Sequence, residues 1–540
     1  MVEDSQTQDT QSNGPNGPER RRYPRQDALL AGQLIFYNAQ GHRQIVGKIR
    51  DVSPSGLSFE SNLDKPPELG TETTVVWVVP PHMGFAPTPK KYRFTGTVVR
   101  QITTGDFGYT LGIRLSHLIP EQIKQREARP QREAAVAMAI VVAALVCFLK
   151  VFNILNFWWA PFFNAYSLLV CAYILVRVAV SMFYKEPVDR GDMPSVSVVM
   201  SAKNEEEHIE QTVRSIFASR YPANLMEVLL IDDGSTDRTW ERMIILAGEF
   251  PRLRLFRHAQ NLGKRQGMAL GAKEAKHSIV VYVDSDSVLQ EEAIYRMVQA
   301  FHDPGVGAVA GQVSVIVEPD NFFSKMEVVR YLISQRVIKA SEGLFNSVMC
   351  VSGPLAAYRR VTLLRVLPDW LTQTFAGTRA TFGDDRSLTN YVLRTHRVVY
   401  HHGAVCNTFV PRTWRQYFKQ QLRWKKSWAR ETYIAATSIM WKKHPLTAIP
   451  FYVGIFTTLL SPIVAVRALF YLPVFLSVSS LPYIIGLFLI NVLLASVFYY
   501  YTRSRYWPYL LAFVVTYIAA LSWQTYYAIL TVRKNQWGTR

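Results

Sequence analysis

Two acidic clusters in the middle of the chain have the residue types and spacing of a site for a cation and a diphosphate. Asp232-Asp233-Gly-Ser-Thr-Asp237 follows one apolar run, and Asp284-Ser-Asp286 follows another. Two carboxylates one residue apart at the end of a strand suit a hard divalent cation that bridges diphosphate oxygens. A lone Asp-x-Asp is usually a solvated turn, but its position after VVYV, with the second cluster after an earlier strand, favours a site.

The elements that must position these carboxylates are the apolar runs themselves. Val196–Met200, Glu227–Asp233 and Ser278–Asp286 are near-continuous apolar segments that end in polar residues, and longer helical stretches separate them. This pattern predicts an α/β block over residues 195–410, with a parallel-rich sheet covered by helices on both faces. Ligands of such sheets bind beyond the carboxyl ends of the strands, where both acidic clusters lie.

Four long apolar runs flank this block and predict an integral membrane protein. They are Ala134–Trp158, Pro161–Tyr184, Leu446–Phe475 and Leu481–Tyr501. Each is long enough to cross a hydrocarbon layer of about 30 Å as a helix. Basic residues flank each pair of runs on one side, which indicates that the block between the pairs is cytoplasmic. We therefore expect about four transmembrane helices, in two pairs.

A further apolar stretch, Tyr506–Val532, has basic residues at both ends. A single span would place one basic group on the outer side, and a helix of about 40 Å is too short to cross twice. An interfacial or re-entrant segment satisfies the charge rule better than a fifth span. Arg177, inside the second run, either lines a polar cavity or extends its side chain to the interface.

Composition limits the partners of the chain. Its 540 residues include 60 Lys plus Arg against 41 Asp plus Glu, a net charge of +19. We expect this charge to face anionic lipid, because no nucleic-acid recognition module is visible. Only four Cys occur, none at Cys-x-x-Cys spacing, so a disulfide framework or a Cys-based zinc site is not expected.

Three further motifs follow in order and make a family resemblance specific. They are Ser352-Gly353-Pro354, Thr381-Phe-Gly-Asp384-Asp385-Arg386 and Gln420-Gln-Leu-Arg423-Trp424. With the acidic clusters, they resemble the motifs of family 2 inverting glycosyltransferases, and above all of hyaluronan synthases and nodulation-type chitin-oligosaccharide synthases. The final Trp537-Gly-Thr-Arg540 is similar to a motif of the same families. The resemblance covers about residues 195–540 and implies a GT-A-type catalytic domain.

The resemblance implies a role for each motif. Asp385 matches the catalytic base, and Asp384 stands where a Glu is common, which leaves Asp384 as the alternative base. Asp286, with Asp284, is implied as the ligand of Mg²⁺ or Mn²⁺. The nucleotide-sugar contacts implied are Asn204, Glu205, Asp232, Asp233, Lys264, Arg265, Asp284, Gln420 and Arg423. The acceptor contacts implied are Ser352, Gly353 and Trp424, whose ring offers an apolar face to a sugar; in isolation such a Trp would be a headgroup anchor.

The first part of the chain is predicted to be a small β-barrel with a ligand site of its own. Six short alternating strands are expected between Leu34 and Leu115, punctuated by Gly, Pro and Asp. Arg21, Arg22 and Arg25, followed by Asp51, Ser53 and Gly56, resemble the RxxxR and (D/N)xSxxG motifs of PilZ domains, which bind cyclic di-GMP. Arginines on a flexible arm suit phosphate and guanine. Bacterial cellulose synthases carry this domain after the membrane region, so their gating geometry does not transfer.

These expectations give the following organisation: a tail (1–19), a PilZ-like barrel (20–118), a linker (119–133), two spans (134–184), the catalytic domain (195–410), amphipathic interfacial helices (411–445), two spans (446–501) and an interfacial or re-entrant end (506–540). The resemblance implies a processive synthase in the bacterial inner membrane. It would take a UDP-sugar, with UDP-GlcNAc and UDP-GlcA favoured, export the growing polysaccharide through its own spans, and respond to cyclic di-GMP. A synthase of short chitin-like oligosaccharides, a single-addition lipid glycosyltransferase, and a cyclic di-GMP receptor with an inactive transferase block remain alternatives.

Overall fold

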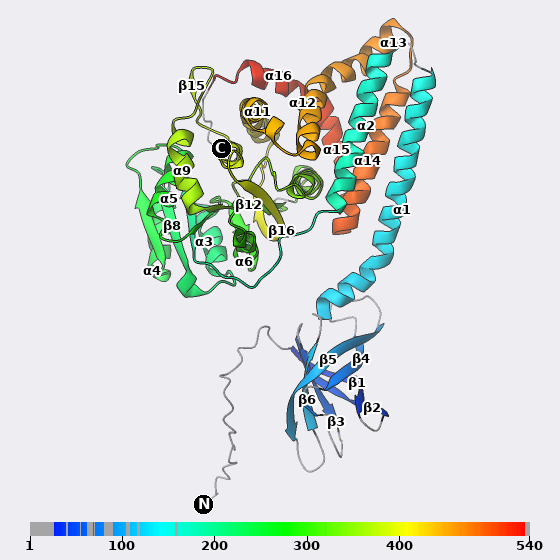
Figure 1. Ribbon diagram of the computed structural model, residues 1–540, viewed down its shortest axis with the longest axis vertical. Coiled ribbons are helices and arrows are strands. Elements are labelled where there is room, and N and C mark those ends of the chain that lie inside the picture. The colour runs from blue at the N-terminus through cyan, green and yellow to red at the C-terminus, as the bar shows by residue number, and fades with distance from the viewer. Residues whose placement is uncertain are drawn as a thin grey trace, which may run out of the picture. The chain divides into compact units, whose positions relative to one another are not determined.

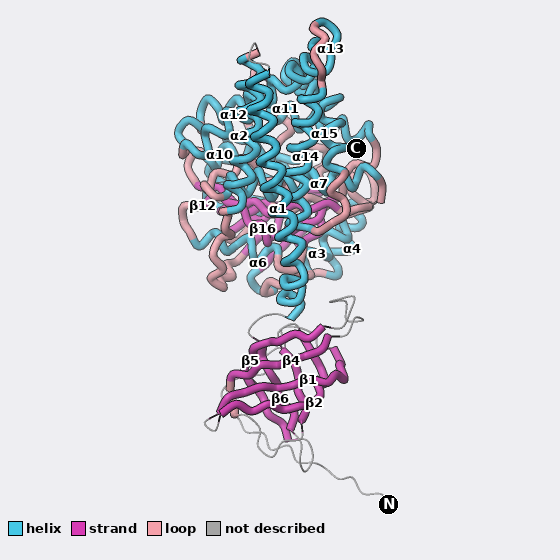
Figure 2. Tube along the Cα trace, turned by 90° about the vertical axis from the view of Figure 1, so that its right-hand side faces the viewer, coloured by secondary structure: helices cyan, strands magenta, loops and turns pink. Residues whose placement is uncertain are grey.

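The computed structural model describes residues 26–38, 41–53, 56–61, 68–69, 71–79, 90–103, 109–115, 119–156, 160–318 and 320–534. The chain divides into two compact units, residues 1–134 and 135–540, and each is described by itself. Figure 1 labels the elements of both units, and Figure 2 gives a second view.

The first unit is built from six antiparallel strands. Their bounds are β1 Gln26–Asn38, β2 Gly41–Ser53, β3 Gly56–Ser61, β4 Glu72–Val79, β5 Lys90–Thr103 and β6 Tyr109–Leu115. They pair in the order β1-β2-β3-β6-β5-β4, and β4 pairs back with β1. Leu57 and Phe59 alternate inward on β3, as Leu111 and Ile113 do on β6, which gives this unit an apolar centre. The strands fall on the six runs that the sequence predicted, and β1 and β2 are longer.

The second unit contains an eight-stranded mixed sheet in the order β11-β16-β12-β13-β10-β7-β8-β9. The strand bounds are β7 Val196–Ala202, β8 Met226–Asp232, β9 Leu253–Arg257, β10 Ile279–Tyr282, β11 Ser287–Leu289, β12 Val306–Val315, β13 Ala356–Arg359 and β16 Arg397–Thr408. The predicted strands β7, β8 and β10 are parallel neighbours. The sheet is mixed because β13 pairs antiparallel with both β10 and β12.

Helices cover both faces of this sheet, as Figure 1 shows. One face packs on α3 Ile209–Phe217, α4 Thr239–Glu249 and α6 Ala293–Val298, and the other on α5 Lys264–Glu274, α9 Arg360–Leu371 and α10 Asp384–Leu393. The two-residue period of the strands divides their apolar residues between these faces: Val198 and Met200 of β7 pack on the first core, and Val199 on the second. Short elements complete the domain: η2 Ala223–Leu225, η3 Gln299–His302, β14 Thr374–Phe375 and β15 Thr378–Arg379.

One long helix connects the sheet to the acceptor motif. It runs through α7 Phe322–Ile333, the π-helical turn η4 Ser334–Lys339 and α8 Ala340–Gly343 without a break. Further along the chain, α11 Trp414–Ser438 carries the Gln-x-x-Arg-Trp motif, and η5 Met440–Lys442 follows it. A capping box at Thr413 and Gln416 fixes the start of α11. Both helices pack on the C-terminal segment rather than only on the sheet.

Among the described residues, five helices or helical runs are long and apolar enough to cross a membrane. The elements are α1 Ile119–Asn156, α2 Pro161–Met182, α12–η6–α13 (Pro445–Val466, Arg467–Tyr471 and Leu472–Phe475), α14 Leu481–Thr502 and α15–η7–α16 (Tyr509–Thr516, Tyr517–Leu521 and Ser522–Leu530). In the second unit, α1, α2 and α14 lie side by side through Val142, Cys171 and Leu493 (Figures 1 and 2). The four spans that the sequence predicted coincide with the first four.

The fifth run covers the stretch that was expected to be an interfacial or re-entrant segment. Residues 509–530 form one uninterrupted helical run of 22 residues, so neither length nor composition excludes a fifth span. It packs on α7 through Met326 and on α11 through Tyr417, with Leu521 between them. The expectation of an interfacial segment used only the charges at the two ends of this stretch. The structure adds that the stretch packs on α7 and α11, the helices that carry or adjoin the catalytic motifs.

Arg177, which the sequence assigned either to a polar cavity or to the membrane interface, contacts the catalytic domain. It is buried in α2, donates 2.7 Å to the Ser341 hydroxyl and lies 3.8 Å from Glu342 Oε1. Both partners belong to α8 of the catalytic domain. The second span is therefore joined to the catalytic domain by a buried polar contact, which the sequence alone left open.

Candidate active site

The Asp284 carboxylate lies between the two sequence motifs that were expected to flank the donor. Lys264, the first residue of α5, pairs with Asp284 Oδ1. This carboxylate, with Asp384 and Asp286 farther away, outweighs the effect of burial and raises the pKa of Lys264. A Cβ on Gly353 would lie 2.8 Å from Asp284 Oδ2, so a side chain at this position would have to displace the Asp284 carboxylate. Asp284, Lys264 and Gly353, from three separate motifs, thus meet at one point.

Asp232 is the last residue of β8, and Asp233 follows it. The carboxylate oxygens of both residues bond to other groups of the protein. Asp232 accepts from the Arg257 guanidinium at 3.0 Å and from the Ser235 amide at 3.1 Å. Asp233 contacts His258 Nδ1 at 2.9 Å and accepts two backbone amides, those of Leu262 and Gly263, each at 2.9 Å. These bonds hold the loop that leads into α5, so Asp233 positions Lys264 through the backbone.

The loop after β7 braces the same region. The Asn204 side chain accepts from the Thr236 amide at 2.9 Å, and its backbone has a positive φ of 56°. The Glu205 amide donates to Thr239 at 2.8 Å. The structure thus places both predicted donor contacts beside the Asp232–Asp237 loop, with the Asn204 amide oxygen bonded to that loop.

Asp384 and Asp385 have different environments although they are adjacent. Asp384 Oδ1 accepts from Arg265 Nε at 2.6 Å. Asp385 Oδ2 accepts only a weak bond, from the Cys350 thiol at 3.4 Å, and its Oδ1 accepts the Arg386 amide at 2.8 Å. Burial and the Asp385 charge raise the pKa of Cys350 to about 12, so this group stays a thiol and a donor. Both carboxylates lie in the first turn of α10, where the helix dipole favours negative charge.

A buried polar network fixes the Gly383-Asp384-Asp385 turn from behind. Arg265 also donates to Gln373 Oε1 at 3.1 Å, and Gln373 donates to Glu431 of α11 at 3.0 Å. Glu431 accepts from Arg430 at 2.7 Å, and Arg430 in turn donates to the Phe382 carbonyl. The Arg265 guanidinium therefore bonds to groups within the protein, and the residue is only 6% exposed. Sequence reasoning assigned Arg265 to the nucleotide, whereas its contacts are those of a residue that holds the turn.

The acceptor motif lies against the π-helical turn. Ser352 Oγ accepts from the ammonium group of Lys339 at 2.8 Å. Ser352, Gly353 and Cys350 belong to one short segment, which meets Lys339, Asp284 and Asp385 in turn. The segment thus connects the predicted acceptor, metal and catalytic residues.

The Gln-x-x-Arg-Trp motif presents one exposed ring and two polar side chains. Trp424 is 37% exposed, and the Arg330 guanidinium lies 5.4 Å from its ring centroid. Gln420 Oε1 is buried without a hydrogen-bond partner, and no described residue pairs with Arg423. These are the free donors and acceptors that a bound substrate requires.

The carboxylates fit a cation that shares its ligands with a substrate. Among the described residues, no three His, Cys, Asp or Glu side chains converge on one point. Mg²⁺ in nucleotide enzymes is commonly held by one or two carboxylates, with phosphates and waters as the other ligands. Asp284 and Asp286, both at the sheet edge, suit this arrangement and do not suit an all-protein metal cage.

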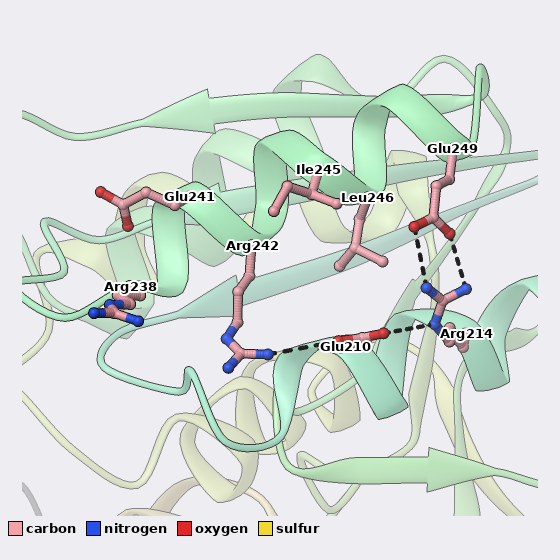
Figure 3. A pocket seen from close by; sticks show the side chains of 8 residues that line it. All are labelled: Glu210, Arg214, Arg238, Glu241, Arg242, Ile245, Leu246 and Glu249. Atoms are coloured by element: carbon pink, nitrogen blue, oxygen red, sulfur yellow. Dashed lines mark hydrogen bonds and ion pairs between the residues drawn. The ribbon is translucent and has the colours of Figure 1, made fainter.

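A charged groove between α3 and α4 contains none of the predicted residues. It is lined by Glu210, Arg214, Arg238, Glu241, Arg242, Ile245, Leu246 and Glu249 (Figure 3). Its side chains pair with one another: Arg214 with Glu249 at 2.9 Å and with Glu210 at 3.0 Å, and Arg242 with Glu210 at 3.5 Å. Exposed pairs of this kind contribute little energy, and they engage four of the six charged side chains of the groove.

Family comparisons agree with the geometry. The description "Glycosyl transferase family 2" matches residues 197–366, which hold the sheet edge, Lys264, Asp284 and Ser352. The chain carries a glycosyl transferase family 2 domain. The PilZ domain description matches residues 19–128. The chain thus carries a family 2 glycosyltransferase domain and a PilZ domain, together with apolar helices typical of a membrane protein.

The relatives of this glycosyltransferase include polymer synthases. The hyaluronan synthase of Streptococcus pyogenes serotype M3 is 28% identical over 413 residues, covering 74% of this chain and 97% of the relative. The N-acetylglucosaminyltransferase of Rhizobium meliloti is 32% identical over 281 residues, covering 50% of this chain and 66% of that protein. Among solved structures, the mannosyltransferase of Pyrobaculum calidifontis in complex with GDP-Man and Mn²⁺ is 22% identical with a TM-score of 0.44, covering 71% of this chain and 98% of that one.

Two sets of predicted residues have no described side chain. Arg21, Arg22 and Arg25 lie outside the described residues, as does the Trp537–Arg540 motif. Asp51 and Ser53 lie at the end of β2, and Gly56 begins β3, so the backbone brings these three positions together at one hairpin. The cyclic di-GMP site stays a prediction from sequence.

Several residues of this glycosyltransferase site carried no sequence signal that we used. His258, Gln373, Arg430 and Glu431 contact the motifs only through the fold. Lys339 was missed because it stands in a helix 13 residues before Ser352, where a lysine reads as a solvated group. The 13 residues between Lys339 and Ser352 do not indicate a contact unless the position of the π-helical turn is known.

Proposed function

We propose that the protein is a processive inverting β-glycosyltransferase that polymerises sugar from a UDP-sugar donor at the cytoplasmic face and exports the polymer through its own spans. UDP-GlcNAc and UDP-GlcA are the favoured donors, because the relatives of the chain are named hyaluronan synthase and N-acetylglucosaminyltransferase. The observation that carries the proposal is the meeting of Asp284, Lys264, Gly353 and Asp385, from four motifs, around one segment at the sheet edge.

The geometry supports distinct roles for the two adjacent carboxylates. Asp385 accepts the proton of the acceptor hydroxyl while that oxygen attacks the anomeric carbon, and the bond to the UDP oxygen breaks on the opposite face. Asp384 Oδ1 accepts from Arg265 Nε at 2.6 Å, whereas Asp385 Oδ2 accepts only a weak bond from the Cys350 thiol at 3.4 Å. This difference favours Asp385 as the base.

Asp284 and Asp286 would hold Mg²⁺ or Mn²⁺, which when bound offsets the charge of the departing diphosphate. Lys264 supplies a second positive charge at the same edge. Gln420 and Arg423 would contact the diphosphate, since a guanidinium donates two parallel bonds to phosphate oxygens. Trp424 would stack on the acceptor sugar.

UDP release from the purified full chain in nanodiscs tests this function. UDP-sugars are supplied singly and in pairs, with and without divalent metal, and product mass is measured. We expect metal-dependent release together with a high-mass product. Release with a product of a few sugars would favour the chitin-oligosaccharide alternative, and no release with any donor would contradict the enzyme reading.

We propose in addition that cyclic di-GMP activates the enzyme through the PilZ domain. Replacing Arg21 and Arg25 by Ala should abolish the increase in UDP release on adding the dinucleotide and leave basal release unchanged. An unchanged response in this variant would overturn the assignment of the site. Loss of basal release would instead indicate damage to folding.

A further inference from the structure

Lys339 is a buried cation that has no counter-ion among the residues that the structure describes. It is 6% exposed and lies in the π-helical turn η4, a kind of helix defect that is frequent at functional sites. Its ammonium group has three N–H donors, and its hydrogen-bond partner is the neutral Ser352 hydroxyl at 2.8 Å. Of the described residues, no carboxylate oxygen lies within 4.0 Å of the Lys339 nitrogen.

The nearest carboxylates are engaged elsewhere. Glu342, one turn along the same helix, pairs with Arg177 and accepts the Met349 amide at 3.1 Å. Asp385 accepts from Cys350 and Arg386. The Tyr400 ring centroid is 5.9 Å away, at the edge of the range in which a ring stabilises a cation. Burial lowers the pKa of Lys339 although Cys350, Glu342 and Asp385 act in the opposite direction.

A charge in this position costs free energy unless something pairs with it. Folding alone would favour an apolar residue here, since the ammonium group has unused donors. One of those donors is bonded to Ser352, the first residue of the acceptor motif. The missing partner is therefore expected on the acceptor side of the site, where the growing chain must present its terminal sugar to Asp385.

We propose that Lys339 binds the acceptor: its ammonium group, held by Ser352, donates to an oxygen of the terminal sugar of the growing polymer. The inference rests on the proposed function. The oxygen is either a hydroxyl of a neutral sugar or a carboxylate of a uronic acid, and both accept from an ammonium group. The two sources differ in charge, so acceptors of the two kinds distinguish them.

The test uses the full chain in nanodiscs and three variants: K339M, K339R and K325M. Met matches the length of Lys without its charge. Lys325 lies on the same helical run, pairs with Asp320 at 2.8 Å and has no contact with the acceptor motif, so K325M controls for loss of a lysine. The readouts are the ratio of UDP released to sugar incorporated, the apparent KM for labelled oligosaccharides, and the melting temperature.

For K339M we expect an increase of about 10- to 100-fold in the acceptor KM, the range for one hydrogen bond to a charged group. Donor hydrolysis without acceptor should persist, so more UDP is released per sugar incorporated. The melting temperature should stay the same or rise, because an unpaired buried charge is removed. K339R should recover part of the transfer, and K325M should match the parent chain.

The outcomes separate the ideas. An effect confined to oligosaccharides that end in a uronic acid assigns the carboxylate, and an effect on neutral ends as well assigns a hydroxyl. An unchanged acceptor KM in K339M, or a lower melting temperature with equal loss of hydrolysis and transfer, overturns the inference and leaves the proposed function standing. If the parent chain transfers no sugar from any donor, the proposed function fails and the inference with it.

Discussion

Asp384 and Asp385 show how neighbours of the same type acquire different roles through their partners. Asp384 is bound to Arg265 inside a polar network, while Asp385 faces Cys350 and the acceptor segment. The difference lies in contacts from α5 and from the segment that contains Cys350, both of which are distant in sequence. We therefore expect Asn at position 385 to impair catalysis and Asn at position 384 to impair stability.

D385N should lower turnover by about 10²- to 10⁴-fold, the usual contribution of a general base, with donor binding and melting temperature unchanged. D384N should instead leave Arg265 as an unpaired buried charge and destabilise the fold by about 3–5 kcal/mol. Turnover, UDP-sugar affinity and thermal unfolding of both variants check this. A D384N variant that is stable and has lost only turnover would move the base to Asp384.

Trp424 is held by a cation that is itself held by a buried carboxylate. Arg330 donates to Glu327 at 2.9 and 2.5 Å, and its guanidinium lies 4.8 Å from the Tyr331 ring and 5.4 Å from the Trp424 ring. Glu327 is fully buried, so removing Arg330 alone would leave a charge unpaired. The paired variant E327Q/R330M avoids this penalty.

We expect E327Q/R330M to fold and to bind acceptor about three- to ten-fold more weakly, the range for one lost cation–π contact. Shorter products at equal donor KM would be the signature, measured by gel filtration of the polymer. The single variant E327Q, which keeps Arg330 on the ring, is the control. Full-length product from the paired variant would show that Trp424 does not depend on Arg330.

At the scale of elements, the turn that begins α10 depends on one glycine. Gly383 has a φ of 77°, and a Cβ there would lie 1.8 Å from the Ser427 hydroxyl of α11. Gly377, in the β14–β15 turn, has a φ of 80° but no heavy atom within 4 Å of its Cβ position. Both glycines have a positive φ, which a residue with a side chain adopts only at a cost. Only at Gly383 would the added Cβ also collide with a neighbouring helix.

G377A should therefore cost about 1–2 kcal/mol, the usual cost of a side chain in the left-handed region. G383A should cost clearly more and also lose turnover, because α11 must move away from the Asp385 turn. Urea unfolding and UDP release of the two variants make the comparison. Equal effects of both substitutions would show that the contact with Ser427 yields easily.

The segment after α2 meets β16 through a carboxylate and two histidines. Glu186 Oε1 lies 3.3 Å from His401 Nδ1 and 3.0 Å from His402 Nδ1. Burial, with the Arg336 charge, lowers the pKa of His402 to about 4 from 6.5. Burial alone would raise the pKa of Glu186, but the hydrogen bond from His401 and the histidine charges lower it to about 2. Glu186 is thus ionised and His402 neutral near neutral pH.

This arrangement predicts lower stability in acid. Between pH 6.5 and 4, the unfolded chain takes up a proton on His402 that the folded chain does not, so the free energy of unfolding falls as pH falls. Below pH 4.5 Glu186 adds a second loss in the same direction. Melting temperature against pH checks this, and H402Q should flatten the part between pH 6.5 and 4.5. An identical profile for H402Q would assign the acid sensitivity to other groups.

At the scale of the whole chain, the sequence predicted the elements better than their contacts. The apolar runs marked β7, β8, β10 and the four predicted spans, because length and period depend on local sequence. The motifs marked Asp284, Asp385 and Trp424, and the fold brings the first two to one segment. The antiparallel β13, the contacts of the helical run 509–530 and the buried partners Lys339, Gln373 and Glu431 depend on packing between distant segments, and no local pattern encodes them.

The contact between Arg177 and Glu342 also limits where the chain can be truncated, and where domains can be exchanged between relatives. A water-soluble fragment cut after the second span would keep Glu342 and Ser341 but lose the guanidinium that satisfies them. It would also be cut close to Tyr184, whose hydroxyl bonds the Tyr400 carbonyl, and Glu186. The catalytic domain therefore includes α2 as a working part, and exchanges of domains between relatives should be joined before residue 161 rather than after residue 182.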